Sequence, residues 1–143
     1  MLSLLLYFQA AGTGPEQPGE ALLSEQIPEA SFDVSRTADG THVISIAGEL
    51  DIASAPGLAA RTAGLRGNVI VDLGELTFID SSGITALVNA SRELGNTGGK
   101  LVIASPPPHT RRVFEIVHLD DVVPVVESLE AALARLSLDG GAA

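Results

Sequence analysis

Hydrophobic and polar residues alternate in the first part of the chain that has the pattern of a folded domain. The segment "SFDVSRTA" (31–38) switches between the two classes at most positions, which is typical of a strand at the edge of a sheet. Asp39 and Gly40 follow it as a strong hairpin-turn signal. The pattern therefore predicts that "THVISIAGEL" (41–50) returns as a second, antiparallel strand.

The next two segments predict a short helix and a buried strand. In "DIASAPGLAARTAGL" (51–65), Ser54 is a candidate N-cap and Pro56 falls in the first turn, an arrangement that favours a helix. "NVIVDL" (68–73) is instead a continuous run of mostly β-branched residues. A run without alternation indicates a strand that is covered on both faces or lies at the centre of a sheet.

The clearest helix of the chain is predicted within "SSGITALVNASRELGNTGG" (81–99). Helical spacing places a mainly apolar set of residues on one face: Ile84, Leu87, Val88, Ser91 and Leu94. A polar set falls on the opposite face: Ser82, Thr85, Asn89 and Arg92. Gly98 and Gly99 are expected to end the helix.

The last third of the chain continues the alternation of strands and helices. "KLVIAS" (100–105) predicts another buried strand, and "PPPHTRRVFEIV" (106–117) predicts a helix that starts after its prolines. The apolar stripe of that helix is expected to consist of Val113, Ile116 and Val117. "DDVVPVV" (120–126) has the pattern of a short strand broken by Pro124, and "ESLEAALARL" (127–136) that of a terminal helix.

The order of these elements is β-β-α-β-α-β-α-β-α. It predicts a single α/β domain with a small mixed sheet that is mostly parallel and has one antiparallel edge. A length of 143 residues suits one domain with a modest core. Because 45% of the residues are hydrophobic and only 3% are aromatic, we expect a core of Val, Ile, Leu and Ala.

The net charge of −10 narrows the choice of partners. Non-specific nucleic-acid binding needs Lys and Arg to neutralise phosphates, and an anionic membrane surface would repel this chain, so neither is expected as a partner. A protein or a small molecule is expected instead, and a basic protein surface is favoured. The chain has no cysteine, and its three histidines lack metal-ligand spacing, so we expect no disulfide, no metal and no cofactor.

The N-terminal "MLSLLLYFQ" (1–9) has an apolar run too short for a membrane span, which needs about 20 residues, and it lacks the basic start of a secretory signal. "LYFQ" matches the end of a protease-cleavage tag. We expect residues 1–27 to be a flexible N-terminal extension or a tag-derived segment, residues 28–138 to form the domain, and residues 139–143 to be a disordered tail. The expected location is the cytoplasm, and the expected state is a monomer or weak dimer.

The stretch Asp80-Ser81-Ser82-Gly83 stands where an apolar strand ends and a helix begins. In a purely structural interpretation, Asp80 or Ser81 caps the helix and Gly83 lets another backbone approach closely. That interpretation does not account for two consecutive hydroxyls, nor for the small polar face that continues from them. A hydroxyl that a partner modifies is therefore a second hypothesis.

Two other chemical hypotheses find less support in the sequence. A serine hydrolase would use Ser81 or Ser82 as its nucleophile, but the G-x-S-x-G elbow is absent and no histidine is evidently placed as a base. A phosphorelay receiver would use Asp72 at a strand end, but no acidic pair follows the first strand to hold its metal. Asp72 is better explained as a carboxylate that bonds to a nearby loop. We therefore assign no catalytic residue and no enzymatic activity.

Three stretches resemble the STAS domain of bacterial anti-sigma factor antagonists: "GELDIASAP", "VIVDLGELTFIDSSGITALV" and "GGKLVIASPPPHTRRVFEIVHLDDVVPVVESLEAAL". The resemblance covers roughly residues 31–137, and its most specific element is the D-S-S-G turn, followed by "GELD". His118 departs from the family, which often has Gly at that position. The resemblance implies a small sheet with helices packed mainly on one side.

The resemblance also implies a function. Such proteins bind, when dephosphorylated, an anti-sigma factor that is itself an ATP-dependent serine kinase, and they thereby free a sigma factor. Phosphorylation ends the complex, and a serine phosphatase is a further expected partner. The implied phosphoacceptor is the Ser directly before the Gly, here Ser82, with Ser81 as the second choice. The resemblance implies that Asp51 contributes to partner contact. Our hypothesis for the whole interface adds Ser54, Asp80, Ser81, Gly83, Thr85 and Asn89. The alternatives are a solvated helix surface for Thr85 and Asn89 and a cap of the 54–65 helix for Asp51.

Elementary electrostatics agrees with this assignment. A phosphate on Ser82 adds about −1.5 to −2 charges at neutral pH. The free amides and the dipole of the helix start are expected to stabilise it within the protein itself. Against one partner carboxylate at about 4 Å, with an effective dielectric of about 20, each unit charge pair is repelled by about 4 kcal/mol, or roughly a thousandfold in affinity. A STAS scaffold or sensor that is not phosphorylated is the alternative within the same fold.

Overall fold

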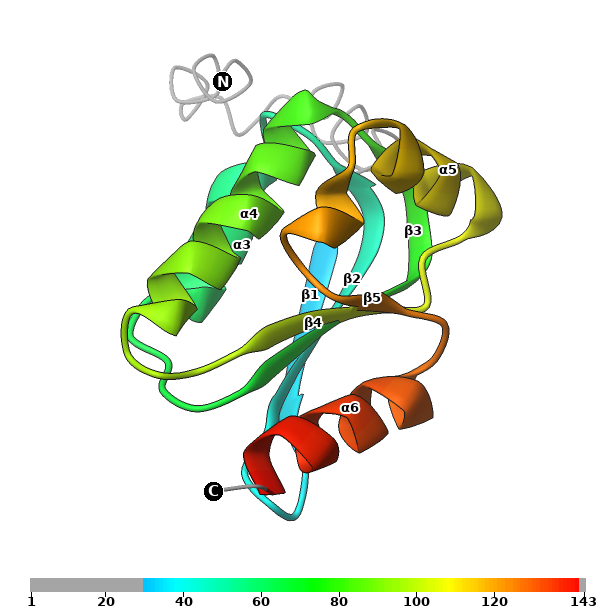
Figure 1. Ribbon diagram of the computed structural model, residues 1–143. Helices are drawn as coiled ribbons and strands as arrows, with labels where there is room; N and C mark the ends of the chain where they lie inside the picture. The colour runs from blue at the N-terminus through cyan, green and yellow to red at the C-terminus, as the bar shows by residue number, and fades with distance from the viewer. Residues whose placement is uncertain (1–29, 142–143) are drawn as a thin grey trace, which may run out of the picture.

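One five-stranded sheet organises the protein, whose computed structural model describes residues 30–141 (Figure 1). The strands have the same order across the sheet as along the chain: β1 (Ser31–Arg36), β2 (His42–Leu50), β3 (Val69–Ile79), β4 (Leu101–Ala104) and β5 (Val125–Val126). β1 pairs antiparallel with β2, and the other pairs are parallel. The predicted mixed, mostly parallel sheet is confirmed. The extension expected at residues 1–27 lies outside the described residues.

The turn between β1 and β2 forms where the Asp39-Gly40 signal predicts it. The amide of Thr41 donates to Asp39 Oδ1 (3.1 Å), and the amide of Thr37 donates to the Thr41 carbonyl oxygen (2.8 Å). Gly40 adopts a φ of +93°, a left-handed conformation that is readily open to glycine. The turn residues therefore fix the register of the hairpin.

β3 lies at the centre of the sheet and is longer than predicted. Residues 69–71 are fully buried, because helices cover both faces of the sheet at this point. The strand does not end at residue 73 but continues through "GELTFI" to Ile79, with a pairing irregularity opposite residues 45–47 of β2. This continuation carries the chain directly to the start of the helix that holds the two serines.

Helices cover the two faces of the sheet unequally (Figure 1). The helical elements are α3 (Ala55–Thr62), α4 (Ser81–Gly95), α5 (Pro108–Ile116), the 3-10 turn η2 (Leu119–Asp121) and α6 (Leu129–Gly141). α3, α4, α5 and η2 share the main core, to which they contribute Leu58, Leu87 and Phe114 among others. Of the described helices, only α6 packs on the other face, through Ala132 and Leu136. The predicted element order, with helices mainly on one side, is confirmed.

The apolar stripe predicted for α5 is wrong. Ile116 is 68% exposed and Val117 is 47% exposed, whereas Thr110 and Phe114 are buried. Positions 110 and 114 are about one turn apart and share a face of the helix. The helix therefore turns its aromatic ring into the core and leaves two aliphatic side chains at the surface.

The end of the domain bears on three further expectations. His118 has a φ of +61°, so the loop after α5 keeps the left-handed conformation that suits the Gly often found there in the family. Pro124 directly precedes β5 and does not interrupt it.

α6 runs to Gly141, so residues 139–141 belong to this helix and not to the expected tail. Residues 142–143 lie outside the described residues. No helix within residues 30–141 is long and apolar enough to cross a membrane.

Candidate functional site

α4 starts immediately after β3, and Asp80 fixes that start. Its Oδ1 accepts hydrogen bonds from the amides of Ser82 (2.9 Å) and Gly83 (3.1 Å), two of the amides that a helix leaves without an internal partner. The Asp80 amide donates to the carbonyl oxygen of Leu50 at the end of β2 (3.3 Å). The predicted cap is therefore confirmed, with Asp80 in that role.

Gly83 lets the first turn of α4 lie directly on the end of β2. A Cβ atom at this position would overlap the carbonyl oxygen of Leu50 and would stand 2.8 Å from Cγ1 of Ile79. Real Cβ atoms essentially never approach that closely. The predicted close backbone approach is confirmed, and it fixes the height of the two serines above the sheet.

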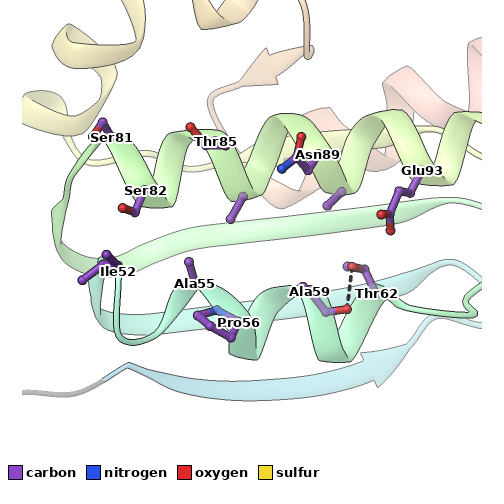
Figure 2. A pocket seen from close by; sticks show the side chains of 12 residues that line it. Ile52, Ala55, Pro56, Ala59, Thr62, Ser81, Ser82, Thr85, Asn89 and Glu93 are labelled. Carbon is purple, nitrogen blue, oxygen red and sulfur yellow. Dashed lines mark hydrogen bonds between the residues drawn. The ribbon is translucent and has the colours of Figure 1, made fainter. Parts of the chain in front are cut away.

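The two serines occupy opposite edges of the first turn of α4. Ser81 is exposed and Ser82 is half-buried. Figure 2 shows the Ser82 side chain on the edge of α4 that faces α3, whereas Ser81 lies on the other edge. Both residues thus have exposed surface, and Ser82 is the one whose side chain lies nearer α3.

The turn between β2 and α3 is closed by its own polar groups. Asp51 Oδ1 accepts from the amides of Ala53 and Ser54 (both 3.1 Å), and Ser54 Oγ accepts from the Asp51 amide (2.9 Å) and donates to the Glu49 carbonyl oxygen (2.7 Å). Ser54 holds the N-cap position of α3 but makes no side-chain cap bond, so its prediction as a cap is only half right. Asp51 shapes the turn that ends β2.

A groove with a volume of about 460 Å³ runs between α3 and α4 (Figure 2). It brings together four residues that the sequence singled out, Ser81, Ser82, Thr85 and Asn89, while Asp51 and Ser54 are not among its lining residues. Sequence reasoning missed the rest of the lining: Ile52, Ala55, Pro56, Ala59, Thr62, Ala86, Ala90 and Glu93. The alanines among them gave no signal in the sequence, because alanine is compatible with a core, a surface or an interface.

The geometry offers little support for an enzyme at this groove. No histidine is among its lining residues, and His109 Nε2 lies instead 3.3 Å from the Thr77 carbonyl oxygen. Within residues 30–141, no group of three or more His, Cys, Asp or Glu residues is placed to hold a metal ion. Asp72 Oδ1 accepts from the Gly74 amide (3.0 Å), so this carboxylate has a structural bond, but the bond lies within β3 and not, as expected, to a nearby loop.

Comparison with known proteins places this sequence and its fold in one family. The family model of the STAS domain matches residues 34–132. A putative anti-sigma factor antagonist of Bordetella bronchiseptica, BtrV, is 36% identical over 101 residues, which cover 67% of this chain and 86% of that protein. An anti-sigma F factor antagonist of Lysinibacillus sphaericus is 30% identical over 89 residues, which cover 59% of this chain and 76% of that protein.

Solved structures agree. An anti-sigma factor antagonist from Mycobacterium paratuberculosis superposes with a TM-score of 0.66 at 28% identity, covering 75% of this chain and 93% of its own. The antagonist SpoIIAA in its unphosphorylated form gives 0.62 at 27% identity, covering 74% and 96%. SpoIIAA of Bacillus in the phosphorylated form gives 0.58 at 27% identity, covering 74% and 99%. This chain belongs to the STAS domain family, among the anti-sigma factor antagonists.

Proposed function

We propose that this protein is a phosphorylation-switched binding protein with no catalytic step of its own. Without phosphate it binds an anti-sigma factor that is a serine kinase, and so frees a sigma factor; phosphorylation of Ser82 by that kinase ends the complex. The observation that carries the proposal is the position of Ser82, half-buried at the first turn of α4 and in the lining of the groove. A kinase can reach this hydroxyl, and a docked partner would cover it.

The choice of Ser82 over Ser81 follows from where a new charge would act. Ser82 faces α3 across the groove, next to Ile52, whose side chain is 75% exposed. A phosphate there stands inside a surface that a partner would have to desolvate. On Ser81 it would stand at the opposite edge of the turn and meet more solvent. That SpoIIAA has been solved in a phosphorylated and an unphosphorylated form supports a switch of this kind.

The hydrogen bonds at the start of α4 correct one part of the electrostatic expectation. The amides expected to receive the phosphate are not all free, because those of Ser82 and Gly83 already bond to Asp80. A phosphate on Ser82 would therefore stand beside a carboxylate. Mutual repulsion favours a phosphate that turns outward, toward the docked partner. Against a partner carboxylate at about 4 Å the cost is again about 4 kcal/mol per unit charge pair.

The remaining residues of the predicted patch contribute in two ways. Thr85 and Asn89 are exposed on α4 and line the groove, so they are assigned direct contacts with the partner. Asp51 and Ser54 contribute through the turn that they close, because this turn presents Ile52 beside Ser82. Asp80 and Gly83 set the position of the serine.

The test combines phosphate transfer with binding. The purified chain is incubated with ATP and, one at a time, with the anti-sigma factor kinases of its host, and the phosphopeptides are identified by mass spectrometry. Ser82→Ala should abolish the modification while retaining binding, and the matched control Ser81→Ala should leave both intact. Phosphorylated wild type should bind roughly a thousandfold more weakly. Phosphate found on Ser81 alone, or a phosphorylated form that binds undiminished, would contradict the proposal.

A further inference from the structure

The groove between α3 and α4 extends along nearly the whole of both helices. A second hollow of about 310 Å³ continues it beyond Glu93, and Thr62 and Glu93 line both. The second hollow reaches Arg66 on one side and Thr97 on the other. From Ser82 to Glu93 alone the axis of α4 advances about three turns, or about 16 Å. The two hollows thus form one furrow that starts at Ser82, and we call it the α3–α4 furrow.

Most side chains that line the first hollow, the groove of about 460 Å³ next to Ser82, are small, and they come from matching levels of the two helices. In Figure 2, Ile52 lies opposite Ser82, Ala59 lies opposite Asn89, and Thr62 lies opposite Glu93. The Thr62 hydroxyl is already engaged, since it donates to the Leu58 carbonyl oxygen (3.1 Å). The lining of the first hollow therefore consists mostly of small side chains. Its only large apolar side chain is that of Ile52, which is exposed and lies at the Ser82 end.

We propose that the α3–α4 furrow receives an amphipathic α-helical segment of the anti-sigma factor, a proposal that rests on the function proposed above. A third helix packs between two others at an axial separation of about 8–10 Å, and small side chains in the furrow permit that approach. Apart from Ile52, the part of the furrow next to Ser82 has no large apolar side chain, and the partner then supplies such side chains there. Ile52 packs against the end of the incoming helix that lies nearest Ser82.

Charge specifies the partner segment further. Glu93 is the one ionisable residue that lines the first hollow. It is exposed and lies where the two hollows join. Arg66 is the cationic residue that lines the second hollow. The incoming helix should therefore carry a Lys or Arg opposite Glu93 and, further from Ser82, an Asp or Glu at the level of Arg66. A basic segment is also favoured by the net charge of −10.

This arrangement explains why one phosphate is enough to empty the whole furrow. Ser82 stands at the mouth, so a phosphate there meets the end of the incoming helix. When the partner helix docks, the phosphate would lose its water and become buried between Ile52 and the partner's side chains, which costs free energy. The phosphate therefore acts on the segment that carries most of the contact, and the rest of the furrow does not need to change shape.

Two neighbouring alanines of α3 provide a matched test. Ala59 and Ala60 are both exposed, but only Ala59 lines the furrow. Ala59→Arg should fill the furrow and weaken binding of the purified anti-sigma factor about thirtyfold or more, as loss of an interface hot spot does. Ala60→Arg, with the same added charge, should bind like wild type. Both are measured by isothermal titration calorimetry on the full chain, after circular dichroism and thermal melting confirm an unchanged fold.

A second pair tests the charge. Glu93→Lys should weaken binding about tenfold, because it repels the partner's Lys or Arg. Glu115→Lys changes the net charge equally on α5, where Glu115 is also exposed, and should leave the affinity within about twofold. This pair keeps the proposal testable if an arginine at position 59 disturbs the packing of α3.

The outcomes separate this proposal from the one it rests on. If phosphorylation of Ser82 releases the partner but neither Ala59→Arg nor Glu93→Lys affects binding, the furrow is not the docking site although the switch stands. If no anti-sigma factor binds the wild type, both proposals fall. If sedimentation shows a dimer of this chain that Ala59→Arg dissolves without affecting the anti-sigma factor, a second copy fills the furrow and the proposal is wrong.

Discussion

α4 and α5 both begin shortly after a parallel strand of the same sheet ends, but different interactions hold their first turns in place. At α4, the Asp80 carboxylate bonds to two amides and Gly83 lies against the end of β2. At α5, Pro107 holds the cap position without a side-chain cap bond, and the Thr110 hydroxyl is buried with no hydrogen-bond partner within the described residues. One start is fixed by hydrogen bonds, the other by proline and by burial.

This difference shows which kind of helix start leaves hydroxyl side chains accessible at the surface. Because bonds and a close backbone contact fix the first turn of α4, its two serines need no contacts of their own to keep it in place and remain at the surface. In the first turn of α5, the one hydroxyl, that of Thr110, belongs to a buried residue. The hydroxyls of the first turn of α4 therefore belong to residues with exposed surface, whereas that of α5 does not.

The largest effect is expected at the contact between α4 and β2. Gly83→Ala should lower the free energy of unfolding by about 3 kcal/mol, since the new methyl group overlaps the Leu50 carbonyl oxygen and the end of Ile79. Gly95→Ala, in the last turn of the same helix, has no atom within 4 Å of the added Cβ and should stabilise by about 0.5–1 kcal/mol. Urea unfolding of both variants checks the prediction, and equal effects would show that the contact with β2 is unimportant.

A smaller loss is expected from the cap itself. Asp80→Ala removes both bonds to the first turn of α4 and should cost about 1–2 kcal/mol of stability. Pro107→Ala at the corresponding position of α5 removes no side-chain bond and should cost less than about 1 kcal/mol, mostly through the unfolded chain. Chemical denaturation of the two variants gives the comparison. A larger loss for Pro107→Ala than for Asp80→Ala would reverse it.

The smallest effect concerns two buried threonines. Thr110→Val replaces a hydroxyl that has no partner within the described part of the chain, and should be neutral or stabilise by about 1 kcal/mol. Thr62→Val at the end of α3 removes a hydroxyl bonded to the Leu58 carbonyl oxygen, and should cost about 0.5–1 kcal/mol. Thermal unfolding should therefore move in opposite directions for the same substitution. A loss at Thr110 as large as at Thr62 would mean that its hydroxyl is satisfied.

The sequence was informative where a pattern has one physical solution. A strong turn at Asp39-Gly40, the buried run 69–71 and the carboxylate before the two serines each allow little else, and each is found as predicted. α5 was harder because Phe114 and the pair Ile116 and Val117 offer competing apolar faces. Which face is buried depends on how the η2 corner closes over the sheet, and local spacing contains no information about that.

The candidate site was predictable on one side only. The residues of α4 that line the groove follow the two serines at helical spacing, so Thr85 and Asn89 could be found from the sequence. The α3 wall of alanines could not, because alanine is compatible with a core, a surface or an interface. Its role appears only when β2 and β3 pair and place α3 parallel to α4. Long-range pairing determines this wall.

The strands have the same order in the sheet as in the chain, and this affects how the protein can fold during its synthesis. Each described strand pairs with the strand before it, so no strand must wait for a distant segment before it can join the sheet. On the ribosome, the hairpin of β1 and β2 can form first and each later strand can add to an existing edge. Each loop to be closed is only the connection between neighbouring strands, which keeps its entropic cost below that of pairing two strands further apart in the chain.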